Sequence, residues 1–497
     1  MKIHELVARA MQATPDARAI RDVDGREASY AAHWQAITDT AALLQEHGLK
    51  AGDRLMIAAE NCHATAVLIF ATSLAGAVAV PVNARMSTPE IARITTHASP
   101  RLIAYTTGFS GDATKHAQAA GARDFSLGFG AFALSAPLPV SGDDATADTA
   151  VILYTTGTTG DPKGVMLTHG NLCFAGDASA KLRNIRGHDL VYGVLPMTHV
   201  FGLASMLMAT STSGAAMQLE SRFQPDRLYT ALKAGATIFP GVPQMHALLM
   251  SYVADHGLAG LGDVPLHYVS SGGAPLDPAW KRKAEAFYGL PLQNGYGLTE
   301  TTAGVSATKN PLGSADISCG PPLPGVEIML DTGVPAATDP GVGEVLTRGP
   351  HVMAGYFRNA QATSDAMQDG WLRTGDLGRI DDTGALHIVG RAKELIIRGG
   401  FNVYPPEVEA AFNDHTAVVQ CAVVGRSLPG GDEEVLAFVQ CADPKTLDTN
   451  ELRAFVAARL TGYKRPNRII AAATLPAAPS GKILKHKLIA VFADQLS

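Results

Sequence analysis

Apolar and polar residues alternate along the chain with two periodicities, and this alternation predicts the architecture. Between about residues 150 and 300, short apolar runs alternate with amphipathic stretches that begin at proline or aspartate and end near glycine. We predict strands at 189–195, 236–239, 266–270 and 291–294, and helices at 225–233, 242–252 and 277–289. Strands that alternate with helices indicate a parallel or mixed sheet with helices on its faces. Such sheets bind ligands at the carboxyl ends of strands, where turns at 155–160, 271–275 and 295–297 carry glycines.

The pattern changes twice towards the C-terminus. Short strands are predicted at 326–330, 343–347 and 385–389, which indicates a smaller β-rich piece. After residue 392 the predicted order is helix, two strands, helix and strand, over 407–412, 418–424, 435–439, 451–460 and 468–472. We therefore predict a multidomain α/β and α+β protein. Residues 1–391 form a large domain of mixed β-sheets flanked by helices, plus a small β-barrel-like piece, and residues 392–497 form a small α+β domain.

Composition and charge narrow the class of protein. The 497 residues are 46% hydrophobic and 17% charged, which is typical of a globular protein with several domains. The formal net charge is -6, whereas proteins that bind nucleic acid are typically basic, so the charge gives no sign of nucleic-acid binding. Five cysteines without a C-x-x-C pair favour reduced thiols and a cytoplasmic setting, and they argue against a cysteine metal site.

One uncharged stretch, 64–83, is long enough to span a bilayer, but Gly76 and Pro81 interrupt it. We interpret it as a buried helix that ends near Leu74, followed by a strand over 77–80, and we expect no stable membrane insertion. The N-terminus is amphipathic, with charges between its apolar positions, which is not typical of a signal peptide.

A glycine- and threonine-rich segment, YTTGTTGDPKGV at 154–165, stands between the apolar runs 150–153 and 165–167. This arrangement predicts a strand, a loop and a second strand. Glycines allow close backbone approach, threonines and amides donate hydrogen bonds, and Lys163 adds positive charge, so the loop suits an anion. The spacing differs from a Walker loop, in which Gly-Lys-Ser/Thr opens a helix. Taken alone, the segment is explained equally well as a surface hairpin.

Four further motifs follow in order. They are NGYGLTET at 294–301, LRTGDLG at 372–378, GRAKELIIRGG at 390–400 and SGKILKHK at 480–487. Together with the 154–165 segment they resemble the AMP-forming acyl-CoA synthetases of the adenylate-forming superfamily, in its fatty-acid and aryl-CoA ligase branch. The resemblance covers essentially the whole chain. It implies an enzyme that uses ATP, Mg²⁺ and coenzyme A to convert a carboxylic acid to an acyl-AMP and then to a thioester.

The resemblance implies a role for each motif. Lys482, His199 and Glu300 are implied as catalytic residues, and Glu300 also as the Mg²⁺ ligand. The implied ATP- and AMP-binding residues are Thr155, Thr156, Gly157, Thr158, Thr159, Gly160, Lys163, Gly272, Gly273, Ala274, Pro275, Asn294, Gly295, Tyr296, Gly297, Thr299, Asp376 and Arg391. The implied coenzyme A contacts are Arg398, Gly399, Gly400 and Phe401, and the implied acyl pocket is lined by His199, Phe201, Val242 and Val305. Lys393 is implied as the hinge of a mobile C-terminal domain.

Each of these residues taken alone also has a structural explanation. Asp376 fits a simple turn, Glu300 fits a carboxylate at a helix start, and Arg391 can pair with any surface acid. Lys482 can be a solvated loop lysine, and His199 can be a buried structural histidine. Core packing explains the apolar residues equally well.

The residues near the acyl motifs limit the substrate. No aspartate follows His199, as it does in members of this superfamily that adenylate amino acids. Asn294 and Gly295 stand where malonate-type ligases carry an arginine before the tyrosine. We therefore expect an apolar monocarboxylic acid, medium-chain fatty or aryl, with coenzyme A as the acceptor.

Two alternatives remain open at this point. One is an acyl-adenylating enzyme that transfers to a carrier-protein thiol in trans, and the other is a nucleotide- or acyl-binding regulator without activity. The expected partners are the carboxylic acid, ATP and coenzyme A, with no nucleic acid, and a homodimer is left open.

Overall fold

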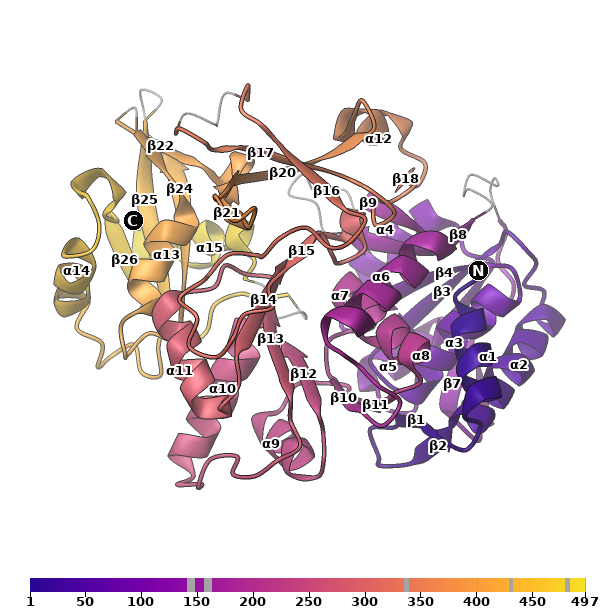
Figure 1. Ribbon diagram of the computed structural model, residues 1–497. Coiled ribbons are helices and arrows are strands. Elements are labelled where there is room, and N and C mark those ends of the chain that lie inside the picture. The colour runs from indigo at the N-terminus through magenta and orange to yellow at the C-terminus, as the bar shows by residue number, and fades with distance from the viewer. Residues whose placement is uncertain are drawn as a thin grey trace.

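The computed structural model describes residues 1–140, 148–155, 163–334, 339–399, 401–428, 432–478 and 483–496. The chain forms two large sheets, a smaller third sheet and an α+β unit at its C-terminal end, as Figure 1 shows. The predicted fold class, a mixed α/β protein with a large N-terminal part and a small C-terminal part, is confirmed.

The first large sheet has the order β15-β14-β13-β12-β10-β11-β1-β2. Its strands are β1 (Arg18–Arg21), β2 (Glu27–Ser29), β10 (Leu190–Gly193), β11 (Ala216–Leu219), β12 (Ile238–Gly241), β13 (Tyr268–Gly272), β14 (Leu292–Tyr296) and β15 (Ser306–Ala307). Pairing is parallel from β1 to β14 and antiparallel at both edges. The strands β12, β13 and β14 are joined through α10 (Pro243–Asp255) and α11 (Pro278–Tyr288), and α9 (Pro225–Lys233) precedes β12. The alternation predicted for this region is confirmed.

The second large sheet has the order β18-β9-β8-β4-β3-β5-β7-β6. Its strands are β3 (Arg54–Ala59), β4 (Val78–Asn83), β5 (Leu102–Tyr105), β6 (Arg123–Leu127), β7 (Gly130–Leu134), β8 (Thr149–Thr155), β9 (Lys163–Thr168) and β18 (Gly355–Tyr356). Its helices are α1 (His4–Ala13), α2 (Tyr30–Glu46), α3 (His63–Leu74), α4 (Thr88–Ala98), α5 (Gly111–Ala119) and α6 (His169–Leu182). Residues 150–168 therefore join this sheet rather than the first one, because β8 pairs in parallel with β4.

The main core lies between the two large sheets. One cluster of buried residues combines alternate positions of β3, such as Leu55 and Ile57, with residues of α3, α6 and the first sheet. The intervening positions, such as Met56 and Ala58, face a second cluster with α4 and α5, as the alternation of strand side chains requires. Helix α3 is buried along nearly its whole length, as predicted. In the described part of the chain, no helix is both long and apolar enough to cross a membrane.

Between α6 and α9 the backbone contains a feature that the sequence did not predict. The short helix α7 (Val200–Gly202) continues into a π-helix, Leu203–Met208, and then into α8 (Ala209–Ser213). A π-turn is wider than an α-turn and is rare away from functional sites. Gly202 lets this helix start close to the preceding backbone, since a Cβ there would lie 2.2 Å from the Pro196 carbonyl oxygen.

The third sheet is antiparallel and has five strands. They are β16 (Glu327–Asp331), β17 (Gly343–Arg348), β19 (Met367–Gln368), β20 (Trp371–Ile380) and β21 (Leu386–Arg391), and α12 (Ala360–Ala366) precedes β19. It corresponds to the predicted β-rich piece, but it is an open sheet and not a barrel, since its order is β16-β17-β20-β19 with β21 paired to β20.

The C-terminal unit contains a hairpin and a three-stranded sheet. Its elements are β22 (Ile396–Arg398), β23 (Phe401–Val403), α13 (Pro405–Asn413), β24 (Gln420–Ser427), β25 (Glu433–Gln440), α14 (Thr449–Ala457), β26 (Arg468–Ala472), α15 (Lys485–Val491) and α16 (Ala493–Leu496). Two core clusters of its own lie on the two faces of the β24-β25-β26 sheet. A small cluster of Val342, Leu377 and Tyr404 joins the unit to the third sheet. The predicted boundary near residue 391 stays a prediction.

Candidate active site

Three motifs that are far apart in the sequence meet at Asp376. Tyr296 is the last residue of β14, and its hydroxyl donates a 2.6 Å hydrogen bond to Oδ2 of Asp376. Asp376 on β20 lies opposite Arg391 on β21, and Arg391 Nε is 2.7 Å from Asp376 Oδ1. The Asp376 side chain is buried, so the alternative of a simple surface turn is wrong. Burial, followed by the Asp376 carboxylate, holds the pKa of Tyr296 well above its ordinary value.

A second group forms where the 154–165 segment approaches the 294–301 motif. Lys163, the first residue of β9, places its Nζ 4.9 Å from the centre of the Tyr356 ring. The Tyr356 hydroxyl donates a 2.9 Å hydrogen bond to Oε1 of Glu300. Glu300 lies in a short 3₁₀ turn, Thr299–Thr301, directly after β14, and its backbone carbonyl accepts from the amide of Met353.

Tyr356 was missed by the sequence analysis. It belongs to β18, a two-residue strand that pairs antiparallel with β9 although it follows β9 by almost two hundred positions. A strand this short leaves no periodic signal, and the motif patterns do not extend to it. Burial, followed by the charge of Glu300, raises the pKa of Tyr356, so its hydroxyl remains a hydrogen-bond donor at neutral pH.

The donor set around Glu300 fits a hard cation. Its carboxylate offers oxygen ligands, and Mg²⁺ is typically bound by one or two carboxylates together with substrate phosphates. Among the described residues, no three His, Cys, Asp or Glu side chains gather into a metal-binding group. A cation at Glu300 would therefore take its remaining ligands from phosphate and water.

Residues predicted for the acyl pocket come together at the end of β13. A Cβ on Gly272 would lie 3.0 Å from Cε1 of Phe201, and one on Gly273 would lie 3.9 Å from Cγ1 of Val242. Gly273, Ala274 and Pro275 are exposed, and Gly273 has a φ of +80°. Phe201 and Val242 thus form an apolar wall beside a backbone segment without bulky side chains.

His199 and Val305 have different environments. His199 is exposed and caps the N-terminus of α7, where its Nδ1 accepts from the Phe201 amide at 3.3 Å. The alternative of a buried structural histidine is therefore wrong. Val305 is fully buried, and its amide donates to the Tyr296 carbonyl at 2.8 Å. It therefore holds the backbone of the 294–301 motif.

The other predicted residues of the 294–301 motif shape the backbone. Asn294 is buried, and its Nδ2 donates to the Ser318 carbonyl at 2.9 Å, so its side chain is held by protein. Gly295 pairs with Ala307 of β15. A Cβ on Gly297 would lie 2.2 Å from the Ala303 carbonyl oxygen, so this position requires glycine. Thr299 begins the 3₁₀ turn that carries Glu300.

The phosphate-loop prediction is tested only at its two ends. Thr155 ends β8 and Lys163 begins β9, and the two residues are opposite each other in an antiparallel pair. The predicted strands on either side of the loop are confirmed. The predicted residues Thr156, Gly157, Thr158, Thr159 and Gly160 lie outside the described residues, and so do Lys482 and Gly400.

The predicted coenzyme A residues lie on the β22–β23 hairpin. The Phe401 ring is 57% exposed and stacks on Tyr463 with 4.8 Å between ring centres. Arg398 donates to the carbonyls of Tyr463 and Arg465 at 3.1 and 2.6 Å. Gly399 has a φ of +57°, and its amide donates to Asp432. The hairpin is thus a fixed, partly aromatic surface of the small unit.

Lys393, the predicted hinge, lies in a 3₁₀ turn at Ala392–Glu394, directly after β21. The neighbouring Glu394 contacts Lys485 at 3.1 Å, and Lys485 also contacts Glu409 of α13 at 2.8 Å. This ion-pair cluster ties the start of α15 to the segment that links the third sheet to the small unit.

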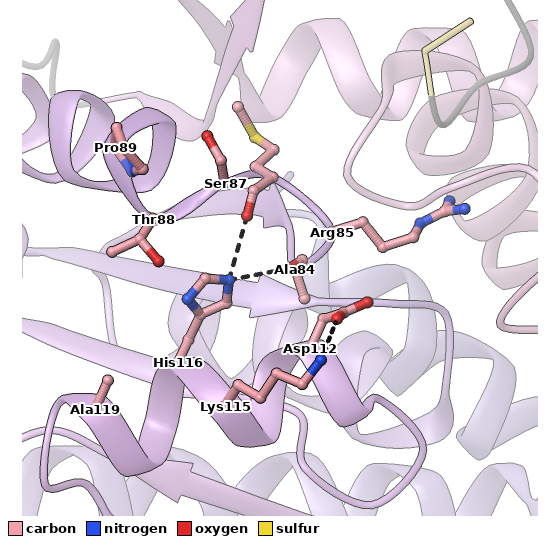
Figure 2. A pocket seen from close by; sticks show the side chains of 10 residues that line it. Ala84, Arg85, Ser87, Thr88, Pro89, Asp112, Lys115, His116 and Ala119 are labelled. Carbon is pink, nitrogen blue, oxygen red and sulfur yellow. Dashed lines mark hydrogen bonds and ion pairs between the residues drawn. The ribbon is translucent and has the colours of Figure 1, made fainter.

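A separate surface cavity of about 510 Å³ lies between the starts of α4 and α5, as Figure 2 shows. His116 Nε2 approaches the carbonyls of Ala84 and Met86 at 3.1 and 3.2 Å, and Lys115 Nζ lies 3.5 Å from Asp112 Oδ1. The side chains that line it thus bond largely to one another or to backbone. The residues that line it do not include those predicted for the site.

Comparison with known proteins places this geometry in context. Residues 7–357 match the family described as AMP-binding enzyme, and residues 407–482 match the AMP-binding enzyme C-terminal domain. A feruloyl-CoA synthase of Amycolatopsis is 32% identical over 492 residues, covering 97% of both chains. A sulfoacetate–CoA ligase of Cupriavidus necator is 33% identical over 460 residues, covering 89% of this chain and 88% of its own.

Solved structures agree over the whole chain. The ATP-bound MatB of Rhodopseudomonas palustris has a TM-score of 0.82 and 30% identity, and all of both chains is covered. The o-succinylbenzoate CoA synthetase of Bacillus subtilis, in complex with ATP and a magnesium ion, has a TM-score of 0.81 and 27% identity, covering 97% of this chain and 98% of the other.

Proposed function

This chain belongs to the AMP-binding enzymes as an AMP-forming acyl-CoA synthetase, and we propose that its substrate is an apolar monocarboxylic acid, aryl or medium-chain. Acyl-CoA ligation with ATP and coenzyme A follows from the family. The observation that carries the choice of acid is the apolar wall of Phe201 and Val242 beside Gly272 and Gly273. An acid with an apolar body would bury its surface there, whereas an unpaired second charge would lose its hydration.

The names of the relatives support this choice only in part. They include a feruloyl-CoA synthase and a long-chain-fatty-acid–CoA ligase of Bacillus subtilis, which is 36% identical over 355 residues. They also include the sulfoacetate–CoA ligase, whose acid carries a second anionic group. The acid must therefore be identified by experiment on this chain.

In the proposed first step, the acid's carboxylate oxygen attacks the α-phosphorus of ATP. The new P–O bond forms as the bond to the β-phosphate oxygen breaks, and pyrophosphate leaves without any proton transfer. Lys163 and the 156–160 loop would neutralise the leaving pyrophosphate, and Lys482 would stabilise charge at the α-phosphate. Glu300 would hold Mg²⁺, which would offset the negative charge of the phosphates.

The nucleoside is the natural partner of the group around Asp376. In the structure the Asp376 carboxylate already accepts a hydrogen bond from Tyr296 and contacts the Arg391 guanidinium. We assign Asp376 and Arg391 to the ribose hydroxyls. Tyr296, with Gly273, Ala274, Pro275, Asn294 and Gly295, is assigned to the adenine, and Gly272 is assigned to the boundary between the adenine and the acyl wall.

In the second step, the sulfur of coenzyme A attacks the acyl carbon, the thiol proton goes to solvent, and AMP leaves. His199 is exposed at the N-terminus of α7, two residues before Phe201, where it would contact the acyl group and move between the two steps. The exposed β22–β23 hairpin with Phe401 would face the pantetheine. All five cysteines are free thiols, which supports a reducing, cytoplasmic setting.

The small domain would turn about Lys393 between the two steps. The predicted contacts of each step are Lys482 and the Gly399–Tyr404 stretch. Both belong to the same small unit, and in the family they lie on different faces of it. Lys393→Pro restricts φ and removes an amide proton at the pivot, so it should spare one half-reaction and slow the other sharply. Unchanged rates for both half-reactions would contradict the rotation.

The proposed substrate is tested by pyrophosphate release with a panel of acids. Aryl and medium-chain acids should be used at least about a hundredfold better than malonate or free amino acids, because burying an unpaired charge costs several kcal/mol. Equal or better kcat/KM on malonate or an α-amino acid would contradict the proposal. The acceptor is tested by comparing the rate of thioester formation with free coenzyme A and with a phosphopantetheinylated carrier protein.

A further inference from the structure

One buried arginine near the acyl wall has no role in the reaction described above. Arg183 caps the C-terminal end of α6 and is only 6% exposed. A buried guanidinium is normally paired with an acid, because its charge is costly to remove from water. Within the described ranges, no Asp or Glu contributes to the electrostatic environment of Arg183, and the Arg183 side chain is hydrogen-bonded to the Tyr268 side chain.

The guanidinium is held by groups that leave one donor unused. Its Nη1 donates to the Ser205 carbonyl in the π-helix. Its Cζ lies 6.0 Å from the centre of the Phe201 ring and 5.9 Å from that of Tyr268, so both rings stabilise the cation. Its Nε is buried and has no hydrogen-bond partner in the described structure. A buried N–H without an acceptor is rare and costly, and it calls for an explanation.

Phe201 links this arginine to the reacting end of the acid. Phe201 contacts Gly272 at the end of β13, and the Arg183 guanidinium carbon lies 6.0 Å from the centre of the same ring. Tyr268, which also faces Arg183, begins β13. The four residue steps from Tyr268 to Gly272 along β13 span about 13 Å. This length suits an acid in which a short spacer joins the carboxylate to an aromatic ring.

The geometry points to Arg183 as a specificity-determining residue that donates its Nε–H to an oxygen at the far end of an aryl acid. The acid's carboxylate would lie near Gly272, its ring would follow Phe201, and its distal oxygen would be the missing acceptor. A phenolic hydroxyl and a carboxylate both present such an oxygen. This inference rests on the proposed function and narrows the acid to an aryl acid with one terminal oxygen acceptor; it extends the proposed function to a second carboxylate only because Arg183 would pair with that charge.

The test compares three acids of one shape on three forms of the full-length enzyme. Cinnamic, 4-hydroxycinnamic and 4-carboxycinnamic acids differ only at the far end. Wild type should favour the better of the two oxygenated acids over cinnamic acid by about tenfold or more in kcat/KM, because a site built to hydrogen-bond a group rejects the analogue without it. Arg183→Met should abolish that preference, and Arg183→Lys, which lacks an Nε–H, should reduce it. Arg186→Met is the matched control, because it removes an exposed arginine three residues further along the chain.

The outcomes separate the inference from the proposed function. If no acid of the wider panel supports pyrophosphate release, the proposed substrate class fails. If wild type uses all three cinnamic acids equally, or if Arg183→Met slows them all by the same factor while the KM for ATP is unchanged, Arg183 serves packing only and the inference is overturned. Thermal unfolding of Arg183→Met and Arg183→Lys shows whether each variant is folded at the assay temperature, and the Lys variant carries the test if the Met variant is not.

Discussion

The proposed nucleotide side and the proposed acyl side of the active site differ in how their polar groups are paired. On the nucleotide side the polar groups are already paired with one another, as Tyr296 and Arg391 are with Asp376, and Tyr356 is with Glu300. On the proposed acyl side, the Phe201 ring lies beside one buried cation, Arg183, whose Nε has no hydrogen-bond partner in the described structure.

The difference explains how each side can treat its ligand. Polar side chains that are paired with one another hold their positions without a ligand. ATP would then replace one of the existing partners, and the side chains would need little rearrangement. An apolar wall selects mainly by shape and size, and selectivity for one methylene is modest. A buried donor that awaits an acceptor adds the selectivity that shape alone does not supply.

The largest expected effect comes from Lys482. Lys482→Ala removes the cation that we propose to stabilise the charge developing on the α-phosphate, and it should slow adenylation by about 10²–10³. Thioester formation from pre-made acyl-AMP should stay near the wild-type rate. Single-turnover kinetics of each half-reaction measure both numbers. Equal loss in both steps would mean that Lys482 does not act in adenylation alone.

Asp376→Asn tests whether the paired group on the nucleotide side serves ATP. The substitution keeps the shape but removes the charge that Arg391 and Tyr296 share, so the KM for ATP should rise about 10- to 100-fold. The KM for the acid should change far less. Asp381→Asn, on the same β20–β21 hairpin and bonded to His387, is the matched control. An equal rise in both KM values would remove the distinction between the two sides.

Glu300→Gln should lower kcat/KM for Mg²⁺·ATP by about tenfold. Removing a group that only supports a metal ligand already costs about 10- to 100-fold in metal affinity or activity, and removing a ligand should cost at least as much. Tyr356→Phe removes only the hydrogen bond to the same carboxylate and should cost less. Initial rates with limiting Mg²⁺ measure both. A fall of less than about threefold for Glu300→Gln, or the same fall for both variants, would exclude Glu300 as the ligand.

Gly272→Ala tests the acyl wall. The added methyl group would lie 3.0 Å from the Phe201 ring, so the ring must shift. Overpacking of this kind costs about 1 kcal/mol or more, and kcat/KM for the acid should fall about fivefold with little change in the KM for ATP. Gly170→Ala, whose methyl group would meet only the Thr168 hydroxyl at 3.6 Å, is the control. An ATP-specific defect would place Gly272 on the nucleotide side.

The smallest expected effect is a pH dependence of stability at Asp277, two residues after the exposed 273–275 turn. Burial, with a further contribution from Asp414 of the small domain, raises the pKa of Asp277 to about 6. A carboxyl with a raised folded-state pKa stabilises the fold when protonated, and this stability is lost as the pH rises from about 4 to 6.

Asp277→Asn keeps the helix cap to Trp280 but cannot ionise. Its melting temperature relative to wild type should therefore increase by a few degrees between about pH 4 and pH 7. Asp414→Asn should show a smaller increase, because it removes only one contribution to the shift. A difference between Asp277→Asn and wild type that does not vary with pH would contradict this account.

The sequence predicted the regular elements well, because periodicity and glycine turns are local signals. Helix α9 begins at Pro225 and ends at Lys233 as expected, since proline and glycine mark its ends. Asp376 and Arg391 were expected at the ribose from the resemblance alone. That they face each other across a strand pair is tertiary information.

The residues that sequence reasoning missed depend on long-range contacts. Tyr356 reaches Glu300 only because a two-residue strand closes the edge of β9. Arg183 follows an ordinary helix end, and nothing local distinguishes it from the exposed Arg186 three residues later. The π-helix likewise has no periodic signature that separates it from an α-helix over six residues.

The pairing of β18 with β9 also affects how the chain is made. Gly355 and Tyr356 cover the outer edge of β9, which carries Lys163 at its start. A ribosome adds about 5–20 residues per second, so roughly 10 to 40 s pass between the synthesis of the two strands. During that interval the edge of the second sheet is open, and an open edge is a site for pairing with other chains. A fragment that stops before Gly355 should therefore aggregate more readily than the full chain.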